Sequence, residues 1–426
     1  MRISPQFSLL AATLPLISIA GLSSALPVTV DTEQTPPPKK FIVVLKNQVT
    51  SSELHNHTVW ATSIHARNLE KRQKNTGTSA VSESVGVEEV YEIDKFKAYA
   101  GSFDAATLSE IEASEDVDYV EEDQPVYITG VQVERTESWS LSVLSAKGAN
   151  WENAARDSNS NRLYRFDESA GEGTYAYILD TGINIAHEDF EGRAELGYNA
   201  VADTDHVDTT GHGTHVAGIV AGKKWGVAKK ANVISVKIMD AGKNSTTAIA
   251  IDGFNWAVRD IIEKGRENVA VINLSVSSNI SKAFNTALEN AYHQGIISVA
   301  SAGNSQRLAT EQSPASASTA IVVGAIDRNG TRWENSNYGH HVTIMAPGTE
   351  IQAASYLDNN STLLYSGTSQ AAPHVVGLIC YLKRLEGLNG TDATKTRLVG
   401  VAQKGVLDES SLKRSPNLFL YNGIEK

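Results

Sequence analysis

Residues 174–183 read TYAYILDTGI, an unbroken apolar strand that ends in an acidic residue and a turn. Four more apolar runs follow, separated by stretches with the spacing of helices. Continuous apolar strands alternating with helices indicate a mainly parallel sheet that is buried on both faces. The sequence therefore predicts an α/β domain. Its strands are expected at 174–179, 232–239, 269–274, 296–300 and 320–325, and its helices at 214–222, about 247–264, 281–293 and about 369–386.

The chain before this domain has a different pattern. A Pro-rich stretch at 31–38 precedes a compact segment of about 90 residues with a strand, helix, strand, helix, strand order, which predicts a small α+β domain over about 40–126. Asp104 is expected to cap the second helix. The elements are expected at 40–46, 51–74, 91–103, 107–114 and 118–126, and residues 128–138 resemble a linker.

The first 25 residues are typical of a secretory signal peptide. Arg2 precedes an apolar stretch from about Phe7 to Ile19, and small residues lead to an expected cut after Ala25. No other run approaches the ~20 apolar residues of a spanning helix. We therefore expect a secreted protein with no membrane association after signal cleavage, an extracellular location being favoured over a vacuole. The expected domains are a signal peptide (1–25), a propeptide (26–130) and a C-terminal domain (131–426).

Charge and cysteine content exclude several classes of function. The net charge is −12, of which −9 falls in residues 26–130 (18 acidic and 9 basic groups). The C-terminal domain is nearly neutral and has no block of Lys and Arg, which argues against nucleic-acid binding. The one cysteine, Cys380, lies in an apolar run, so an internal disulfide and a Cys-based zinc site are both excluded.

Four polar residues stand at predicted strand ends or helix starts, where a parallel sheet places its reactive groups. Asp180 ends the first strand, His212 and Ser369 open helices, and Asn304 follows a strand. Each alone has an ordinary interpretation as a turn or cap residue. His212 and His215 could also bind a metal, but no further ligand stands at a recognisable spacing. The motifs are GHGTHVAG (211–218), VASAGN (299–304) and SGTSQAAPHVVG (366–377).

Together these residues form the set that a serine hydrolase needs. A hydroxyl requires a base for its proton, a carboxylate that orients the imidazole, and a donor for the oxyanion. The chain order Asp180, His212, Ser369 is that of the subtilisins. An esterase with a nucleophile elbow would need GxSxG, whereas this chain has GTSQA at 367–371.

The chain resembles the subtilisin family of serine endopeptidases, and most of all the secreted fungal proteases of the proteinase K group. The resemblance runs from about Trp139 to the C-terminus, and its further segments are DESAG (167–171), GVAKK (226–230), NYG (337–339) and APGT (346–349). The front domain resembles the inhibitor-type propeptide of the family through residues 96–108 and 119–124. This implies an autoprocessed zymogen, cut between about Pro125 and Arg135, whose propeptide inhibits its own enzyme.

The resemblance implies a role for each site residue. Ser369 is the nucleophile, His212 the base, Asp180 its orienting carboxylate, and Asn304 an oxyanion donor together with the Ser369 amide. The resemblance also implies protein and peptide substrates, a monomer and no required cofactor. The implied substrate-binding residues are Ser275, Val276, Ser277, Ser301, Ala302 and Gly303.

Several positions depart from the family pattern. Ser277 and Ser278 replace glycines and are expected to narrow the cleft, residues 243–245 differ on the opposite edge, and Ser301 replaces an alanine. Gln370 stands in place of a methionine. Thr343 replaces an aspartate that helps to bind calcium, so a structural calcium ion is doubtful. These changes leave a catalytically silent binding or inhibitory protein as the alternative function.

Overall fold

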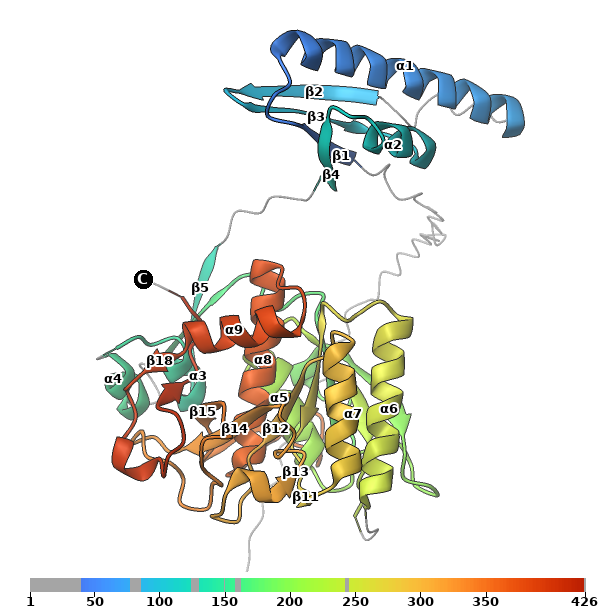
Figure 1. Ribbon diagram of the computed structural model, residues 1–426. Coiled ribbons are helices and arrows are strands. Elements are labelled where there is room, and N and C mark those ends of the chain that lie inside the picture. The colour runs from blue at the N-terminus through green and yellow to red at the C-terminus, as the bar shows by residue number, and fades with distance from the viewer. Residues whose placement is uncertain are drawn as a thin grey trace, which may run out of the picture. The chain divides into compact units, whose positions relative to one another are not determined.

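The computed structural model describes residues 40–76, 86–123, 130–148, 150–157, 162–241 and 245–424. The chain divides into two compact units between residues 127 and 128 (Figure 1). The predicted signal peptide and the Pro-rich stretch lie outside the described residues. Within the described residues, no helix combines the length and the apolar character needed to cross a membrane.

The first unit is an antiparallel sheet with two helices, in the strand order β2-β3-β1-β4. Its buried core includes Val43 and Leu45 from the sheet and Leu54 and Ile64 from the long helix. Its elements are β1 (Lys40–Leu45), α1 (Ser51–Thr76), β2 (Gly86–Ile93), β3 (Phe96–Ser102), α2 (Ala105–Glu112) and β4 (Val117–Glu122).

Two details of this unit can be compared with the sequence patterns. The cap is confirmed, since Asp104 accepts a hydrogen bond from the backbone N–H of Thr107 at 2.8 Å. The single strand predicted over 91–103 is wrong, because this stretch spans a hairpin of β2 and β3. Asp94 makes the turn with a φ of 51°. No glycine or proline marks that turn, and only the two polar residues Asp94 and Lys95 separate the strands.

The second unit is built on a nine-stranded sheet in the order β18-β19-β15-β14-β12-β10-β7-β9-β8. The pairs from β8 to β19 are parallel, and only β18 is antiparallel to its neighbour. The predicted α/β architecture is confirmed. The strands are β7 (Tyr175–Asp180), β8 (Ala194–Asn199), β9 (Asn232–Lys237), β10 (Ala270–Leu274), β12 (Ser298–Ser301), β14 (Ile321–Ile326), β15 (Ile344–Pro347), β18 (Gln403–Lys404) and β19 (Leu418–Phe419).

Helices cover both faces of this sheet. In the chain, α5 lies between β8 and β9, α6 between β9 and β10, and α7 between β10 and β12, and α6 packs beside α7. The long helix α8 packs beside α5 and against β10, β12 and β14 (Figure 1). These helices are α5 (His212–Ala221), α6 (Thr247–Glu263), α7 (Lys282–His293) and α8 (Thr368–Glu386).

Shorter elements surround this core. The linker predicted over 128–138 is wrong in part, because residues 131–135 form β5, which pairs antiparallel with β6 (Leu163–Asp167). All five residues of β5 are exposed, Val131 and Val133 included, so this strand has no buried face. The other elements are α3 (Trp139–Leu144), α4 (Asn150–Arg156), β11 (Ser278–Asn279), β13 (Gln312–Ser313), β16 (Ile351–Ala354), β17 (Thr362–Tyr365) and α9 (Thr391–Val401).

Candidate active site

The residues singled out in the sequence meet at the carboxyl edge of the parallel sheet. Asp180 is the last residue of β7, Ser301 is the last residue of β12, and Ser275 directly follows β10. His212 is the first residue of α5, and Ser369 is the second residue of α8. Neighbouring parallel strands end at the same edge, so these segments are brought together although they are far apart in the sequence.

Asp180 and His212 form a direct pair. Asp180 is fully buried, and its Oδ1 lies 2.7 Å from His212 Nδ1. The backbone N–H of Thr181 also donates to Oδ1, at 2.8 Å. Burial disfavours the charged imidazole, but the negative charge of Asp180, its hydrogen bond and the charge of Asp208 outweigh burial and raise the pKa of His212 above its usual 6.5. Asp180 thus fixes the proton on Nδ1 and leaves Nε2 as the basic nitrogen.

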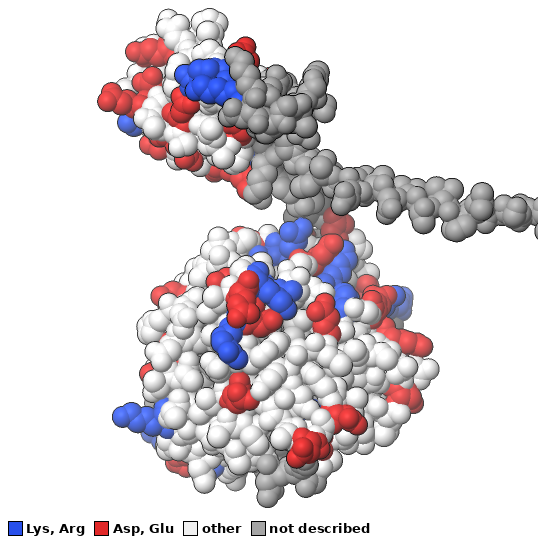
Figure 2. Space-filling model, turned by 90° about the vertical axis from the view of Figure 1, so that its right-hand side faces the viewer, with Lys and Arg blue, Asp and Glu red and all other residues white. Residues whose placement is uncertain are grey.

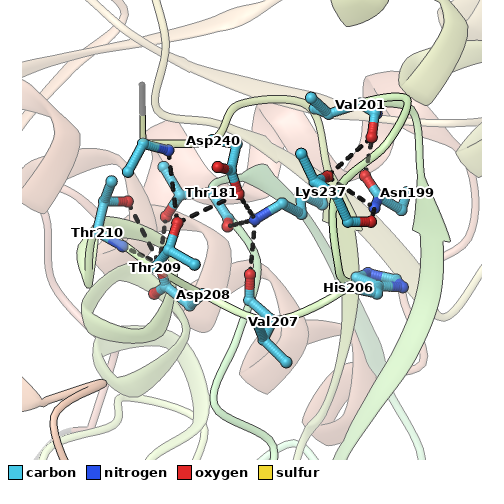
Figure 3. Close-up of polar contacts among 12 residues, drawn as sticks. Thr181, Asn199, Val201, His206, Val207, Asp208, Thr209, Thr210, Lys237 and Asp240 are labelled. Carbon is cyan, nitrogen blue, oxygen red and sulfur yellow. Dashed lines mark hydrogen bonds and ion pairs between the residues drawn. The ribbon is translucent and has the colours of Figure 1, made fainter. Parts of the chain in front are cut away.

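Asp208 ties the start of α5 to the end of β7 (Figure 3). Its Oδ1 accepts hydrogen bonds from the Thr181 hydroxyl and the Gly211 N–H, both at 2.8 Å. Its Oδ2 accepts from the backbone N–H and hydroxyl of Thr214 at 2.9 and 2.6 Å. These bonds satisfy N–H groups that the first turn of a helix leaves without an internal partner. The clamp therefore joins the segment that carries Asp180 to the helix that carries His212.

Lys237 bonds to the same two segments and lies beside Thr181 in Figure 3. Its side chain is fully buried, and Nζ donates to the carbonyl oxygens of Thr181 at 3.0 Å and Val207 at 2.6 Å. Nζ also pairs with Asp240 Oδ2 at 2.5 Å. A buried ammonium needs such a set of acceptors to offset its lost hydration. Lys237 thus cross-links the β7 turn and the loop before α5.

Ser369 is held at the start of α8 by an exchange of bonds with Ser275. The Ser369 hydroxyl donates to the Ser275 carbonyl at 3.2 Å, and the Ser275 hydroxyl donates to the Ser369 carbonyl at 3.0 Å. Pro373 lies four residues after Ser369 and has no N–H, so the helix itself cannot satisfy that carbonyl. Ser275 replaces the missing helical bond, which explains how the helix accommodates a proline beyond its first turn.

Asn304 is oriented by Thr368. The backbone N–H and the hydroxyl of Thr368 donate to Asn304 Oδ1 at 3.0 and 2.7 Å. The Thr368 hydroxyl in turn accepts the Gly303 N–H at 3.1 Å. With Oδ1 engaged, the Nδ2 donor of Asn304 faces the space beside Gly367, where it lies 3.3 Å from the position that a Cβ on Gly367 would take.

The six predicted substrate-binding residues lie on two segments at this edge. Ser275 is buried, Val276 is half-buried and Ser277 is exposed on the way to β11. Ser301, Ala302 and Gly303 are buried at the end of β12. Gly303 has a φ of 98°, and a Cβ there would lie 2.2 Å from Gln312 Oε1, so this position requires glycine.

A cavity of about 350 Å³ lies beside the first segment. Apolar side chains of Met239, Ala250, Val276 and Phe284 contribute to its lining. Ser277 and Ser278 also line this cavity. Of the opposite edge, residues 243 and 244 lie outside the described residues.

Two alternative chemistries can be compared with the structure. His215 is buried, and its Nε2 lies 3.0 Å from the Ile351 carbonyl and 3.1 Å from the Leu363 carbonyl. Burial lowers its pKa to about 4, so the ring is neutral and its Nε2–H donates to the carbonyls of β16 and β17. Burial raises the pKa of the Cys380 thiol to about 12, which leaves no reactive thiolate. Within the described ranges, no cluster of three or more His, Cys, Asp or Glu side chains could hold a metal ion.

Sequence reasoning missed the residues that position the others, namely Thr368, Asp208 and Lys237. One signal for Asp208 is present in the sequence. Asp208 lies three residues before Gly211, the residue that precedes α5, and Asp side chains often bond to nearby backbone N–H groups in loops. The roles of Thr368 and Lys237 depend on contacts between distant segments, which no local pattern reveals.

Comparisons with known proteins agree with this geometry. Residues 171–411 match the model of the subtilase family, and residues 40–129 match the peptidase inhibitor I9 family. The chain is 47% identical over 386 residues to alkaline protease 1 of Aspergillus flavus. This match covers 91% of each of the two chains. It is 40% identical over 417 residues to a subtilisin-like proteinase of Magnaporthiopsis poae, covering 96% of this chain and 98% of the relative.

A solved structure gives the same result for the fold. The crystal structure of a cold adapted subtilisin-like serine proteinase aligns with a TM-score of 0.60 and 30% sequence identity. The alignment covers 68% of this chain and 100% of that protein. The resemblance drawn from the sequence motifs is therefore confirmed.

Proposed function

The chain belongs to the subtilase family and is a serine endopeptidase made as a zymogen, and we propose that Asp180, His212 and Ser369 are its catalytic triad. The observation that carries this proposal is the 2.7 Å contact between Asp180 Oδ1 and His212 Nδ1, beside the helix start that presents Ser369. The silent alternative receives no support from the relatives, which are named as proteases.

In the proposed reaction, His212 Nε2 removes the proton of the Ser369 hydroxyl as Oγ bonds to the scissile carbonyl carbon. The hydroxyl first gives up its hydrogen bond to the Ser275 carbonyl. The oxyanion is stabilised by Asn304 Nδ2 and the Ser369 backbone N–H. His212 then returns the proton to the leaving amine, the C–N bond breaks, and water releases the acyl group by the same steps in reverse order.

We propose that the two segments at the sheet edge bind the substrate backbone through Ser275, Val276 and Ser277 on one side and Ser301, Ala302 and Gly303 on the other. The 350 Å³ cavity beside Val276 then receives a substrate side chain. Its lining by Met239, Ala250 and Phe284 favours an apolar one. Profiling the cleavage sites in a peptide library tests this preference.

We propose that residues 1–25 direct export and that the propeptide is released by a cut between β4 and β5. The first unit ends its sheet at Glu122, and β5 of the second unit begins at Val131. A cut between these residues leaves intact both the pairing of β4 with β1 and the pairing of β5 with β6. This interval overlaps the range expected from the sequence, which runs from about Pro125 to Arg135.

Export would expose glycosylation motifs of the Asn-x-Ser/Thr type. Asn273 is fully buried in β10 and is unsuited as an acceptor. Asn244 lies outside the described residues. The exposed acceptors are Asn56, Asn279, Asn329, Asn359, Asn360 and Asn389.

The proposed partners are protein and peptide substrates and the enzyme's own propeptide. On the face of the second unit seen in Figure 2, basic and acidic side chains stand among uncharged ones and form no broad basic surface. This supports the expectation that the enzyme does not bind nucleic acid. A monomer acting without a membrane is the simplest form of this proposal.

The proposed chemistry uses side chains and water, and it requires no cofactor. Thr343 stands where the family often has an aspartate that helps to bind a structural calcium ion. Its hydroxyl accepts a hydrogen bond from the Val322 N–H at 3.1 Å, and a neutral hydroxyl is a poor substitute for a carboxylate ligand. The residues present do not fit a strong calcium site there.

One experiment tests the core of the proposal. The secreted protein is analysed by intact mass and N-terminal sequencing, before and after treatment with a fluorophosphonate, with Ser369→Ala in parallel. We expect a mature form that starts between residues 123 and 131 and gains one adduct, and a variant that stays uncut and unlabelled. A wild-type protein that remains joined to its propeptide and takes no label would overturn the proposal.

A further inference from the structure

The space beside Gly367 has three polar groups, of which the proposed reaction uses two. A Cβ placed on Gly367 would lie 3.3 Å from Asn304 Nδ2 and 3.6 Å from the Ser369 backbone nitrogen, which are the two proposed oxyanion donors. It would lie closer still, at 2.9 Å, to Gln370 Oε1. We call the space between these groups the oxyanion pocket. The carboxamide of Gln370 is therefore the third polar group that lines the oxyanion pocket.

The Gln370 carboxamide has a donor that no described protein group accepts. The residue is only 2% exposed, and its Nε2 is buried without a hydrogen-bond partner among the described residues. A buried amide donor without an acceptor costs about 1–3 kcal/mol. The group therefore gains from any state that supplies an acceptor.

Formation of an oxyanion supplies that acceptor. In the resting enzyme, Oε1 is the carboxamide atom closest to the Cβ position on Gly367. A negatively charged oxygen in the pocket repels Oε1 but attracts Nε2. A half-turn of the carboxamide exchanges these two atoms without moving the rest of the side chain.

We propose that Gln370 is a further catalytic residue, whose Nε2–H donates a hydrogen bond to the oxyanion beside those of Asn304 and Ser369. This inference rests on the proposed triad, because it requires that the tetrahedral intermediate forms on Ser369. It predicts an interaction made in the transition state and absent with bound substrate, which affects kcat rather than KM.

The test compares Gln370→Met with the wild-type mature enzyme. Methionine has a similar length but no N–H donor. One hydrogen bond to a charged group is worth a factor of about ten to a hundred, so kcat is expected to fall by that factor with KM unchanged. A peptidyl aldehyde forms a hemiacetal with Ser369 whose oxygen occupies the pocket, and its affinity should fall by the same factor.

Gln403→Met is the matched control. Gln403 is also a buried glutamine, but it bonds to Gly148 and Ala146 in a different part of the unit. The Gln403→Met variant should have a lower melting temperature but an unchanged kcat per titrated active site.

An unchanged kcat in Gln370→Met would overturn the proposal. A lower kcat with unchanged aldehyde affinity would also overturn it, since packing alone would then explain the loss. Failure of the wild-type Ser369 to take a fluorophosphonate label would instead overturn the triad itself.

Discussion

The backbone N–H and hydroxyl of Thr368 both donate to Asn304 Oδ1, at 3.0 and 2.7 Å, so the side chain of Asn304 is locked with its donor toward the oxyanion pocket. Preorganisation of this kind makes a donor effective, because no rearrangement is needed as charge develops. The neighbour of the proposed nucleophile, Thr368, thus determines the orientation of Asn304, the proposed oxyanion donor.

Loss of the hydrogen bond from the Thr368 hydroxyl to Asn304 should reduce catalysis. Thr368→Val keeps the shape and the backbone N–H but loses the hydroxyl, and we expect kcat to fall about threefold to tenfold. Asn304→Leu should cost about a hundredfold to a thousandfold, a magnitude measured for the matching donor of a subtilisin, a member of the same family. The control is Thr394→Val, which removes a buried hydroxyl bonded to Gly390 in α9 and should leave kcat unchanged. Equal kcat values for the Thr368 variant and the wild type would contradict the lock.

The pH dependence should follow His212. As the proposed base, His212 acts in its neutral form, and its pKa is raised, so kcat/KM should decline as the pH falls through a value above 6.5. Asp208 contributes to the raised pKa through its negative charge. In Asp208→Asn the decline should therefore move to lower pH. Asp205→Asn changes an exposed carboxylate in the same loop and should leave the profile in place. A decline of kcat/KM at higher pH in the Asp208 variant than in the wild type would contradict this effect of Asp208 on the pKa of His212.

Stability should depend on Lys237. Lys237→Met leaves the nearly buried carboxylate of Asp240 without its cation and two carbonyls without a donor. Loss of one partner of a buried pair costs about 3–5 kcal/mol, measured as the free energy of unfolding in denaturant. Serine-modified enzyme avoids self-digestion during the measurement. Lys264→Met breaks a more exposed pair with Asp260 and should cost about 1 kcal/mol or less. Similar losses for the two variants would contradict a special role of Lys237.

Resistance to oxidants should come from Gln370. An amide cannot form the sulfoxide that peroxide makes of methionine. Incubation with peroxide should therefore inactivate Gln370→Met faster than the wild type, with each activity expressed relative to its own untreated sample. Equal inactivation rates would show that the residue after the nucleophile does not determine this sensitivity.

Removal of calcium should have little effect. Because the Thr343 hydroxyl is bonded within the β14–β15 region and offers no charge, the melting temperature of the mature enzyme should be unchanged by a calcium chelator. Thermal unfolding with and without chelator measures this. A large drop would reveal a site elsewhere in the chain.

The sequence predicts those parts of the molecule in which a local pattern meets a strong physical constraint. Continuous apolar runs predict β7, β9 and β10 because both faces of that sheet are buried, and the strand ends then place Asp180 and Ser275 at one edge. The sequence does not predict that Ser275 replaces the helical bond that Pro373 cannot make. That contact joins residues 94 positions apart, and it exists only after the sheet and α8 have packed.

The same limit explains the first strand of the second unit. All five residues of β5 are exposed, so burial does not produce its pairing with β6. The strand is held by its backbone ladder and by the pair between Glu134 and the nearly buried Lys229 at 3.5 Å. Val131 and Val133 alternate with polar residues but are both exposed, so their pattern does not correspond to burial against a core.

This ladder has a consequence for the life of the released enzyme. An aminopeptidase needs a free, extended end to remove residues one at a time. Once the propeptide is gone, such trimming halts where the main chain becomes hydrogen-bonded from Val131 onward to Asp167 and its neighbours. Ragged ends are thereby confined to the few residues upstream of the ladder, and the body of the enzyme is protected from erosion at the end that its own activation creates.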